Sequence, residues 1–244
     1  MKIPSNLIKT LQQAKHVVIL TGAGVSAESG VPTFRDALTG LWAQYDPHEL
    51  ATPEAFRRNP KLVWDWYAWR RELVGNVAPN PAHFAIVKMA QHLPKLTLIT
   101  QNVDGLHERA GSTNVIELHG NISKVKCLGL NHPSDSWDES ADVPPICPQC
   151  GSYLRPDVVW FGESLPREEL ETAVSATQSC DLFFSIGTSA LVQPAASLPL
   201  MAQQNGTPTV EVNPQPTPIT HAMTHVLPHP AGEIMPALVH AAWT

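Results

Sequence analysis

A short apolar run that ends in a glycine turn constrains the fold of this chain more than any other feature. The run covers residues 16–20, His-Val-Val-Ile-Leu, and is followed by the turn Gly22-Ala23-Gly24. An apolar run of this length predicts a buried strand. Glycine has no Cβ and tolerates positive φ, so the turn lets the backbone come close to another group. Open α/β sheets bind dinucleotides at such turns, where phosphates meet exposed backbone N–H groups.

The loop after this turn carries side chains that suit a nucleotide. Ser26 offers a hydroxyl group, Phe34 a ring that would cover a flat ligand, and Arg35 a permanent positive charge for a pyrophosphate. The Gly-x-Gly-x-x-Gly fingerprint is incomplete, because Ala27 stands where the third glycine belongs. A plain turn without a ligand therefore remains an alternative at this point.

Polar or small residues also follow four later runs that are predicted as strands, at residues 96–100, 115–118, 181–186 and 209–212. The residues at these strand ends are Gln101, Asn102, Val103, Asp104, His119, Gly187, Thr188, Ser189 and Asn213. Segments predicted as helices alternate with the strands, at residues 61–74, 82–91, 170–178, 194–204 and 231–242. This alternation predicts an α/β fold, a Rossmann-like parallel sheet with helices on both faces. Ligands of such sheets bind at the carboxyl ends of the strands, so one shared crevice is expected.

Each polar residue also has an ordinary structural explanation. Asn102 and Asp104 are of types that form turns by bonding their own backbone. A lone histidine such as His119 is often a structural residue. At a strand end beside a nucleotide crevice, however, its imidazole would take a proton near neutral pH. The convergence of five strand ends favours the binding site.

Composition excludes several classes of protein. The 244 residues suit one large domain or one domain with a small insert. A formal charge of −6 argues against a nucleic-acid partner, and no apolar run approaches the length of a membrane helix. The first 15 residues lack the features of a secretory signal, so a cytoplasmic location is expected. Residues 31–60 are predicted as a long loop, which in a compact domain is usually functional.

The four cysteines lie in the second half of the chain, which indicates a local site and not a disulfide framework. Cys147-Pro148-Gln149-Cys150 has the spacing of a metal-binding knuckle, and Cys127 would open its partner. The surrounding residues form short β-like pieces rich in proline. A metal-free loop packed by Trp137 is the alternative, and Cys180 is expected to be a buried apolar residue.

Taken together, these motifs resemble those of the sirtuins, NAD-dependent protein-lysine deacylases. The resemblance rests on residues 22–35, 100–104, 106–107, 110–111, 118–120, 159–163 and 187–189, which occur in the family's order over nearly the whole chain. It implies a single catalytic domain, residues 1–244. A large NAD-binding part would span about residues 1–120 and 160–244, and a small zinc-ribbon-like insert about residues 121–159.

The resemblance also implies roles for individual residues. The NAD-binding set would be Gly22, Ala23, Gly24, Ser26, Phe34, Arg35, Gln101, Asn102, Val103, Asp104, Gly187, Thr188, Ser189, Asn213 and Ala231. Asn102 and Asp104 would shape the nicotinamide pocket, and His119 would be the general base for a ribose hydroxyl group. The products would be nicotinamide, O-acyl-ADP-ribose and free lysine. Acylated lysine-containing proteins would bind as an added strand along residues 158–163, which include Val159, Phe161 and Gly162.

The acyl group is suggested by Tyr67 and Arg70, which are three residues apart and share a face of a predicted helix. Without a family context, core aromatics and a solvated arginine explain them well. Tyr-x-x-Arg in this region resembles class III sirtuins, which remove succinyl and malonyl groups. A guanidinium and a phenol would bind the distal carboxylate. Acetyl-lysine would lack that contact but is expected as a further substrate.

The metal site departs from the family pattern. Sirtuins generally carry a second Cys-x-x-Cys, but this chain has Cys127-Leu128-Gly129-Leu130. The expected ligands of a structural zinc are Cys127, Cys147 and Cys150, with His132 as a candidate for the fourth. A degenerate or empty site remains an alternative.

The same motifs raise three alternative functions. Mono-ADP-ribosyl transfer would use the same loss of nicotinamide with a different acceptor. A dehydrogenase is disfavoured by the broken glycine fingerprint and by the lack of an acidic residue at the end of the next strand. A non-catalytic NAD sensor is disfavoured by the presence of Asn102, Asp104 and His119.

Overall fold

Six parallel strands form the larger sheet of the computed structural model, which describes residues 3–32, 45–134, 137–138 and 143–244. The sheet has the order β3-β2-β1-β7-β8-β9. Its strands are β1 (His16–Thr21), β2 (Lys95–Thr100), β3 (Ile116–Glu117), β7 (Leu182–Ile186), β8 (Thr209–Val212) and β9 (His225–Leu227). The paired strands are parallel throughout. The α/β fold predicted from the sequence is confirmed, although β9 was not predicted.

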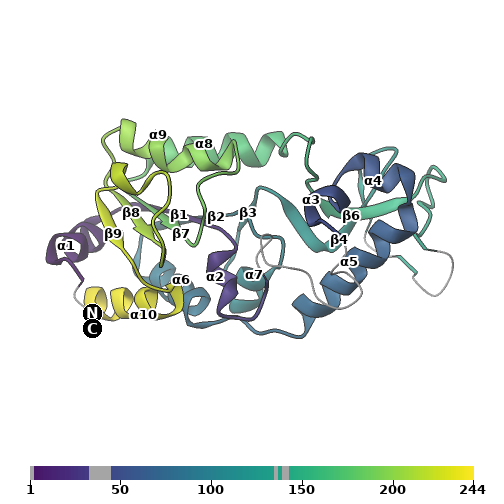
Figure 1. Ribbon diagram of the computed structural model, residues 1–244. Helices are drawn as coiled ribbons and strands as arrows, with labels where there is room; N and C mark the ends of the chain where they lie inside the picture. Colours follow the sequence, from purple (N-terminus) through teal and green to yellow (C-terminus); the bar gives the residue numbers. More distant parts are fainter. Residues whose placement is uncertain (1–2, 33–44, 135–136, 139–142) are drawn as a thin grey trace.

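Helices cover both faces of this sheet (Figure 1). Side chains alternate across a strand, so neighbouring residues of β1 meet different helices. Val17 and Ile19 belong to the core cluster that includes α1 (Ser5–Gln13), α6 (Pro81–His92) and α10 (Ala231–Trp243). Val18 and Leu20 pack in another cluster with α8 (Arg167–Ser179) and α9 (Leu198–Gln204). Burial on both faces explains why the sequences of these strands are continuous apolar runs.

The strand order reverses direction between β1 and β7. From β1 the chain adds β2 and β3 on one side, and later adds β7, β8 and β9 on the other. Short helical segments lie in the connections, namely α2 (Gly24–Ala27), α7 (Leu106–Ala110), η2 (Ala195–Ser197) and η3 (Thr220–Ala222). Ligands of open α/β sheets bind in the crevice at such a switch point.

A small antiparallel sheet lies at the other end of the molecule (Figure 1). It contains β4 (Gly120–Cys127), β5 (Pro133–Ser134) and β6 (Leu154–Val158), in the order β5-β4-β6. Three helices pack against it, α3 (Pro47–Leu50), α4 (Pro53–Arg58) and α5 (Pro60–Gly75). Phe56, Trp66 and Tyr67 from the helices share a core with Ile122 and Val158 from the sheet.

The expectation of a loop over residues 31–60 was wrong for part of this range. Helices α3 and α4 lie within it, while residues 33–44 lie outside the described part of the chain. The Thr52 hydroxyl accepts the Ala55 N–H at 3.1 Å, and Pro53 follows it as the first helical residue. Proline at this position removes only an N–H that would have no partner, so it starts the helix instead of breaking it.

Among the described helices, none combines the length and the apolar character that crossing a membrane requires.

Candidate active site

Three glycines bring the turns after β1 and β7 into direct contact. The Gly24 N–H donates to the Gly187 carbonyl oxygen at 2.8 Å. A Cβ on Gly24 would lie 2.7 Å from the Gly187 Cα, and one on Gly22 would lie 2.8 Å from the Thr188 Cα. Gly187 has a φ of +61°, and a Cβ there would lie 2.4 Å from the Val25 nitrogen. These residues are therefore glycine because two turns meet here, which shapes the floor of the crevice.

Amide side chains from the residues that follow β2 and β8 meet Thr188 at this floor. Gln101 Nε2 donates to Thr188 Oγ1 at 3.0 Å, and Asn213 Nδ2 donates to the Thr188 carbonyl oxygen at 2.8 Å. Ser189 follows in the same turn. The structure thus brings together the predicted residues that follow β1, β2, β7 and β8.

Asn102, Ser26 and Asp104 form a buried polar group beside the turns. Asn102 Nδ2 donates to Ser26 Oγ at 3.1 Å, which joins the end of β2 to α2. Asp104 Oδ1 accepts the Leu106 N–H at 2.9 Å. Burial raises the pKa of the Asp104 carboxyl group, while this bond and the nearby Arg109 and Arg70 partly oppose the rise. Val103 packs toward the core of the small sheet.

The orientation of His119 is set by one hydrogen bond. Its Nδ1 lies 2.9 Å from the Gln101 carbonyl oxygen. A carbonyl can only accept, so Nδ1 carries the proton and the neutral ring has its lone pair on Nε2. Burial lowers the pKa of His119, while the bond to Gln101 opposes this. The ring is therefore a base at neutral pH.

Two buried histidines, His83 and His107, pack near Ser26. His83 Nδ1 accepts the Asn80 N–H at 3.2 Å, so Nε2 carries the proton that points to Ser26 Oγ, 3.5 Å away. The ring of His107 lies 4.8 Å from that of His83, and its Nε2 is 2.9 Å from Thr21 Oγ1. The sequence predicted no role for His83, and His107 was included only as part of the family motif at residues 106–107. For His83 the local signal was Asn80-Pro81 before a helix, which is the N-terminal cap of α6.

Two further residues of the predicted NAD-binding set, Ala23 and Ala231, lie at α2 and α10. Ala23 precedes α2, and the buried Ala231 begins α10. Glu28 Oε1 accepts the Gly232 N–H at 2.7 Å and so ties the two helices together. Phe34 and Arg35 lie outside the described residues.

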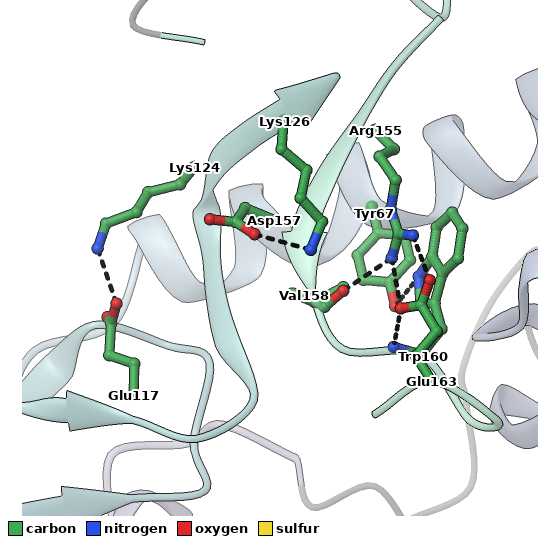
Figure 2. A network of polar contacts seen from close by, with 9 residues as sticks. All are labelled: Tyr67, Glu117, Lys124, Lys126, Arg155, Asp157, Val158, Trp160 and Glu163. Carbon is green, nitrogen blue, oxygen red and sulfur yellow. Dashed lines mark hydrogen bonds and ion pairs between the residues drawn. The ribbon is translucent and has the colours of Figure 1, made fainter. Parts of the chain in front are cut away.

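Tyr67 and Arg70 lie one turn apart on α5, where Tyr67 is part of the core shared with the small sheet. Tyr67 is 2% exposed, and its Oη accepts a hydrogen bond from Trp160 Nε1 at 3.0 Å (Figure 2). The Arg70 guanidinium lies 4.9 Å from the Trp66 ring and 5.9 Å from the Tyr67 ring. Burial lowers the pKa of Arg70, and the charges of Tyr67 and Asp104 oppose this. The guanidinium is therefore within electrostatic reach of the Asp104 side of the crevice.

Residues 159–163 follow β6, and a backbone hydrogen bond ties this segment to His119. The Val159 N–H donates to the His119 carbonyl oxygen at 2.9 Å, and the Phe161 N–H donates to the Ala51 carbonyl oxygen at 2.9 Å. Phe161 is 42% exposed, and Gly162 has a φ of +88°. The segment is thus an anchored turn beside the histidine, with an exposed aromatic ring.

Three cysteines and one histidine gather in the small sheet. The ligand atoms of Cys127, His132 and Cys147 lie within 4.8 Å of one another. Cys150 Sγ is 3.4 Å from Cys127 Sγ, and His132 Nε2 is 3.5 Å from Cys147 Sγ. The His132 Nδ1 donates to the Pro133 carbonyl oxygen at 2.8 Å, which leaves the Nε2 lone pair for a metal. Tetrahedral zinc places its sulfur ligands about 3.8 Å apart, so this donor set fits zinc.

Cys180 lies apart from this cluster, as expected. It is buried, and burial raises the pKa of its thiol to about 11. A thiol with so high a pKa is unreactive at neutral pH.

A parallel sheet whose strand-end turns and polar side chains converge at the switch point defines a dinucleotide-binding α/β protein. Comparison with protein families narrows this class, because residues 22–194 match the model described as the Sir2 family. The chain therefore belongs to the Sir2 family, as its sequence motifs predicted.

Individual relatives agree with this assignment. The chain is 50% identical over 245 residues to "NAD-dependent protein deacylase 1" of Pseudomonas aeruginosa, with 97% of this chain and 98% of the relative covered. A solved structure of a Sir2 homologue in complex with NAD is similar with a TM-score of 0.91 and 48% identity, over 99% of this chain and 94% of that one. A structure of Sir2 bound to an acetylated peptide has a TM-score of 0.87 and 29% identity, with 98% of each chain covered.

Proposed function

We propose that this chain uses NAD to remove acyl groups from protein lysine side chains, with nicotinamide, O-acyl-ADP-ribose and free lysine as products. The observation that carries the proposal is His119, held with a basic Nε2 at the rim of the crevice where four strand ends meet. The relatives named as deacylases and the similar structure with NAD support the same reaction.

The crevice offers a donor set that fits NAD. Around the pyrophosphate we expect the turn residues Gly22, Ala23, Gly24, Ser26, Gly187, Thr188 and Ser189, with Phe34 and Arg35 from the segment outside the described residues. Gln101 would hold the nicotinamide ribose, and Asn213 and Ala231 the adenosine end. Asn102, Val103 and Asp104 would line the nicotinamide pocket. NAD supplies a ribose that accepts the acyl group as nicotinamide leaves.

His119 would then act on a hydroxyl group of that ribose. Its Nε2 takes the hydroxyl proton, and the Gln101 carbonyl stabilises the imidazolium through Nδ1–H. Buried dipoles such as the Asn102–Ser26 pair exclude water and stabilise the charge that develops on the ribose.

The peptide would bind along residues 159–163. Four N–H groups of this segment already bond within the protein, those of Val159, Trp160, Phe161 and Glu163. An acyl-lysine peptide added as a strand would therefore bond mainly to its carbonyl oxygens and to Gly162. The peptide-bound Sir2 structure supports a peptide substrate of this kind.

The proposed acyl groups are succinyl and malonyl, with acetyl as a further substrate. Arg70 would pair with the distal carboxylate, and Tyr67 would donate its phenol proton to it. Burial, the largest influence, raises the pKa of Tyr67 to about 12, so its hydroxyl group is protonated at neutral pH and able to donate.

A peptide assay tests both parts of the proposal. One peptide carrying acetyl-, malonyl- or succinyl-lysine is incubated with NAD, and the products are followed by mass. We expect His119→Ala to abolish turnover on every peptide, because the base is lost. Arg70→Met should lower kcat/KM for succinyl-lysine by about 100-fold and for acetyl-lysine far less, since a charged hydrogen-bonded pair is worth roughly 3 kcal/mol.

Three results would contradict it. Full activity of His119→Ala would remove the proposed base, and equal losses of Arg70→Met on both acyl groups would remove the carboxylate pocket. Transfer of labelled ADP-ribose onto the peptide without loss of the acyl group would indicate mono-ADP-ribosyl transfer instead.

The same proposal includes a structural zinc held by Cys127, His132, Cys147 and Cys150. The four cysteines form no disulfide among the described residues, which suits the cytoplasmic location that we propose. We propose the same boundaries for the two parts as the sequence predicted. The zinc module would span about residues 121–159, and the NAD-binding part about residues 1–120 and 160–244.

A further inference from the structure

A partly buried ion pair between Arg155 and Glu163 lies near Tyr67 and Trp160 (Figure 2). The Arg155 side chain is 5% exposed, and its Nη1 and Nη2 lie 2.5 and 2.9 Å from the two carboxylate oxygens of Glu163. Nη2 also donates to the Val158 carbonyl oxygen at 2.8 Å. Such a forked pair fixes the plane of the guanidinium as well as its place.

The ion pair holds Trp160 from two sides. The Glu163 carboxylate accepts the Trp160 backbone N–H at 2.8 Å, and the guanidinium carbon of Arg155 lies 3.3 Å from the centre of the Trp160 ring. Phe56 packs on the ring with a centroid distance of 5.3 Å. The indole is 1% exposed and has little freedom to rotate.

The fixed indole directs its N–H at Tyr67. The distance from Trp160 Nε1 to Tyr67 Oη is 3.0 Å, and indole can only donate. A phenol O–H prefers the plane of its ring and so has two favoured directions. The one that points at the indole N–H is blocked by that proton, so the hydroxyl proton of Tyr67 points to the other side.

We propose that Trp160 is a specificity-determining positioning residue for carboxylated acyl groups. Its indole N–H occupies an acceptor site of Tyr67 Oη, and the Tyr67 hydroxyl proton is thereby aimed at the distal carboxylate of succinyl- or malonyl-lysine. Arg155 and Glu163 act through Trp160 by holding the indole in place. The inference rests on the proposed acyl pocket of Tyr67 and Arg70.

The arrangement couples the acyl pocket to the peptide-binding segment. Trp160 lies between Val159, which bonds to His119, and Phe161, which bonds to Ala51. The residue that orients Tyr67 is thus part of the turn along which the peptide would lie. Placement of the peptide and recognition of its acyl group would then depend on one set of contacts.

The test is Trp160→Phe, which removes the N–H but keeps an aromatic ring under Arg155. We measure kcat and KM for succinyl- and acetyl-lysine in one peptide sequence. The ratio of kcat/KM for succinyl to that for acetyl should fall about fivefold, mainly through the KM of the succinyl peptide, as loss of one oriented hydrogen bond predicts. Trp243→Phe is the control, because it makes the same substitution on α10, where the ring packs on the core of the larger sheet. That control should leave the ratio unchanged.

A double-mutant cycle separates orientation from general loosening. In a Tyr67→Phe background, Trp160→Phe should lower the ratio no further, because no hydroxyl group remains to be aimed. Arg155→Lys keeps the charge but loses the fork, and should lower the ratio in the same direction, which also covers the case that Trp160→Phe does not fold.

The deacylase activity of the wild-type chain tests the proposed function separately. If it removes acetyl and succinyl groups but Trp160→Phe lowers both equally, the inference is overturned and the deacylase stands. An additive loss in the Tyr67→Phe background would overturn it as well. If the wild-type chain removes no acyl group, the proposed function itself is wrong.

Discussion

At the scale of single residues, His83 and His107 make stability depend on pH. Burial lowers the pKa of His83 to about 4, and burial together with the nearby His83 lowers that of His107 to about 3. In the unfolded chain both titrate near 6.5. Between these values the unfolded state binds protons that the folded state does not, so folding stability falls as the pH falls below about 6.5.

We expect the free energy of unfolding to drop by about 2 kcal/mol per histidine between pH 7 and pH 5. Denaturant titrations at the two pH values measure this. His83→Asn should be less stable at pH 7 but should lose about 2 kcal/mol less on acidification. The exposed His221→Asn is the control and should behave like the wild-type chain. Equal losses in all three chains would contradict the prediction.

The difference between His119 and His83 shows which residues a sequence can reveal. His119 follows a recognisable strand and precedes Gly120, so its place at the crevice could be predicted. His83 contacts Ser26 and His107, which are 57 and 24 positions away in the chain. No local pattern marks such a contact, because the packing of α6 on α7 creates it.

At the scale of elements, the contact of two turns depends on Gly24. A Cβ there would lie 2.7 Å from both the Cα and the carbonyl oxygen of Gly187, and backbone atoms cannot move away cheaply. Gly24→Ala should therefore destabilise the fold by about 2–3 kcal/mol and weaken NAD binding. Thermal unfolding and NAD titration measure the two effects.

Gly75→Ala is a matched control at the end of α5. Nothing lies within 4 Å of a Cβ at this position, and its backbone is helical. The substitution should stabilise the chain by about 0.5–1 kcal/mol, because alanine favours helix. A Gly24→Ala chain as stable as the wild type would show that the turns adjust, contrary to the prediction.

The same elements show why the sequence was informative about strands and less so about short helices. Buried strands such as β1 and β7 stand out as apolar runs, since helices cover both of their faces. Helix α4 has six residues, too few for a periodic pattern. Its only signal was Thr52-Pro53, a cap followed by proline. The glycine turn was predicted to approach a ligand, and the structure adds that it approaches Gly187.

At the scale of the whole molecule, the small sheet supports α5, the helix that carries the proposed acyl pocket. Trp64 of α5 packs among Cys127, Cys147, Val125 and Leu154. Three residues further along the same helix stands Tyr67. The sequence could reveal the cysteine spacing, but the packing of α5 on the cysteine cluster required the three-dimensional structure.

Loss of zinc should therefore act on acyl specificity more than on NAD binding. We expect one zinc per wild-type chain by elemental analysis, and much less in His132→Ala. The variant should melt about 5 °C lower, because the module that anchors α5 loosens. Its activity on succinyl-lysine should fall more than its affinity for NAD, since the crevice lies on the larger sheet.

His221→Ala is the control for this experiment, because its side chain is exposed and lies outside the cluster. It should keep the metal content, melting temperature and activity of the wild-type chain. Unlike His132→Ala, His132→Cys should bind zinc as the wild-type chain does. Its fourth thiolate gives the four-cysteine ligand set of the family pattern. Full zinc content in His132→Ala would exclude His132 as a ligand. Full zinc loss with unchanged desuccinylation would show that α5 holds its place without the metal, and the proposed support from the small sheet would fall.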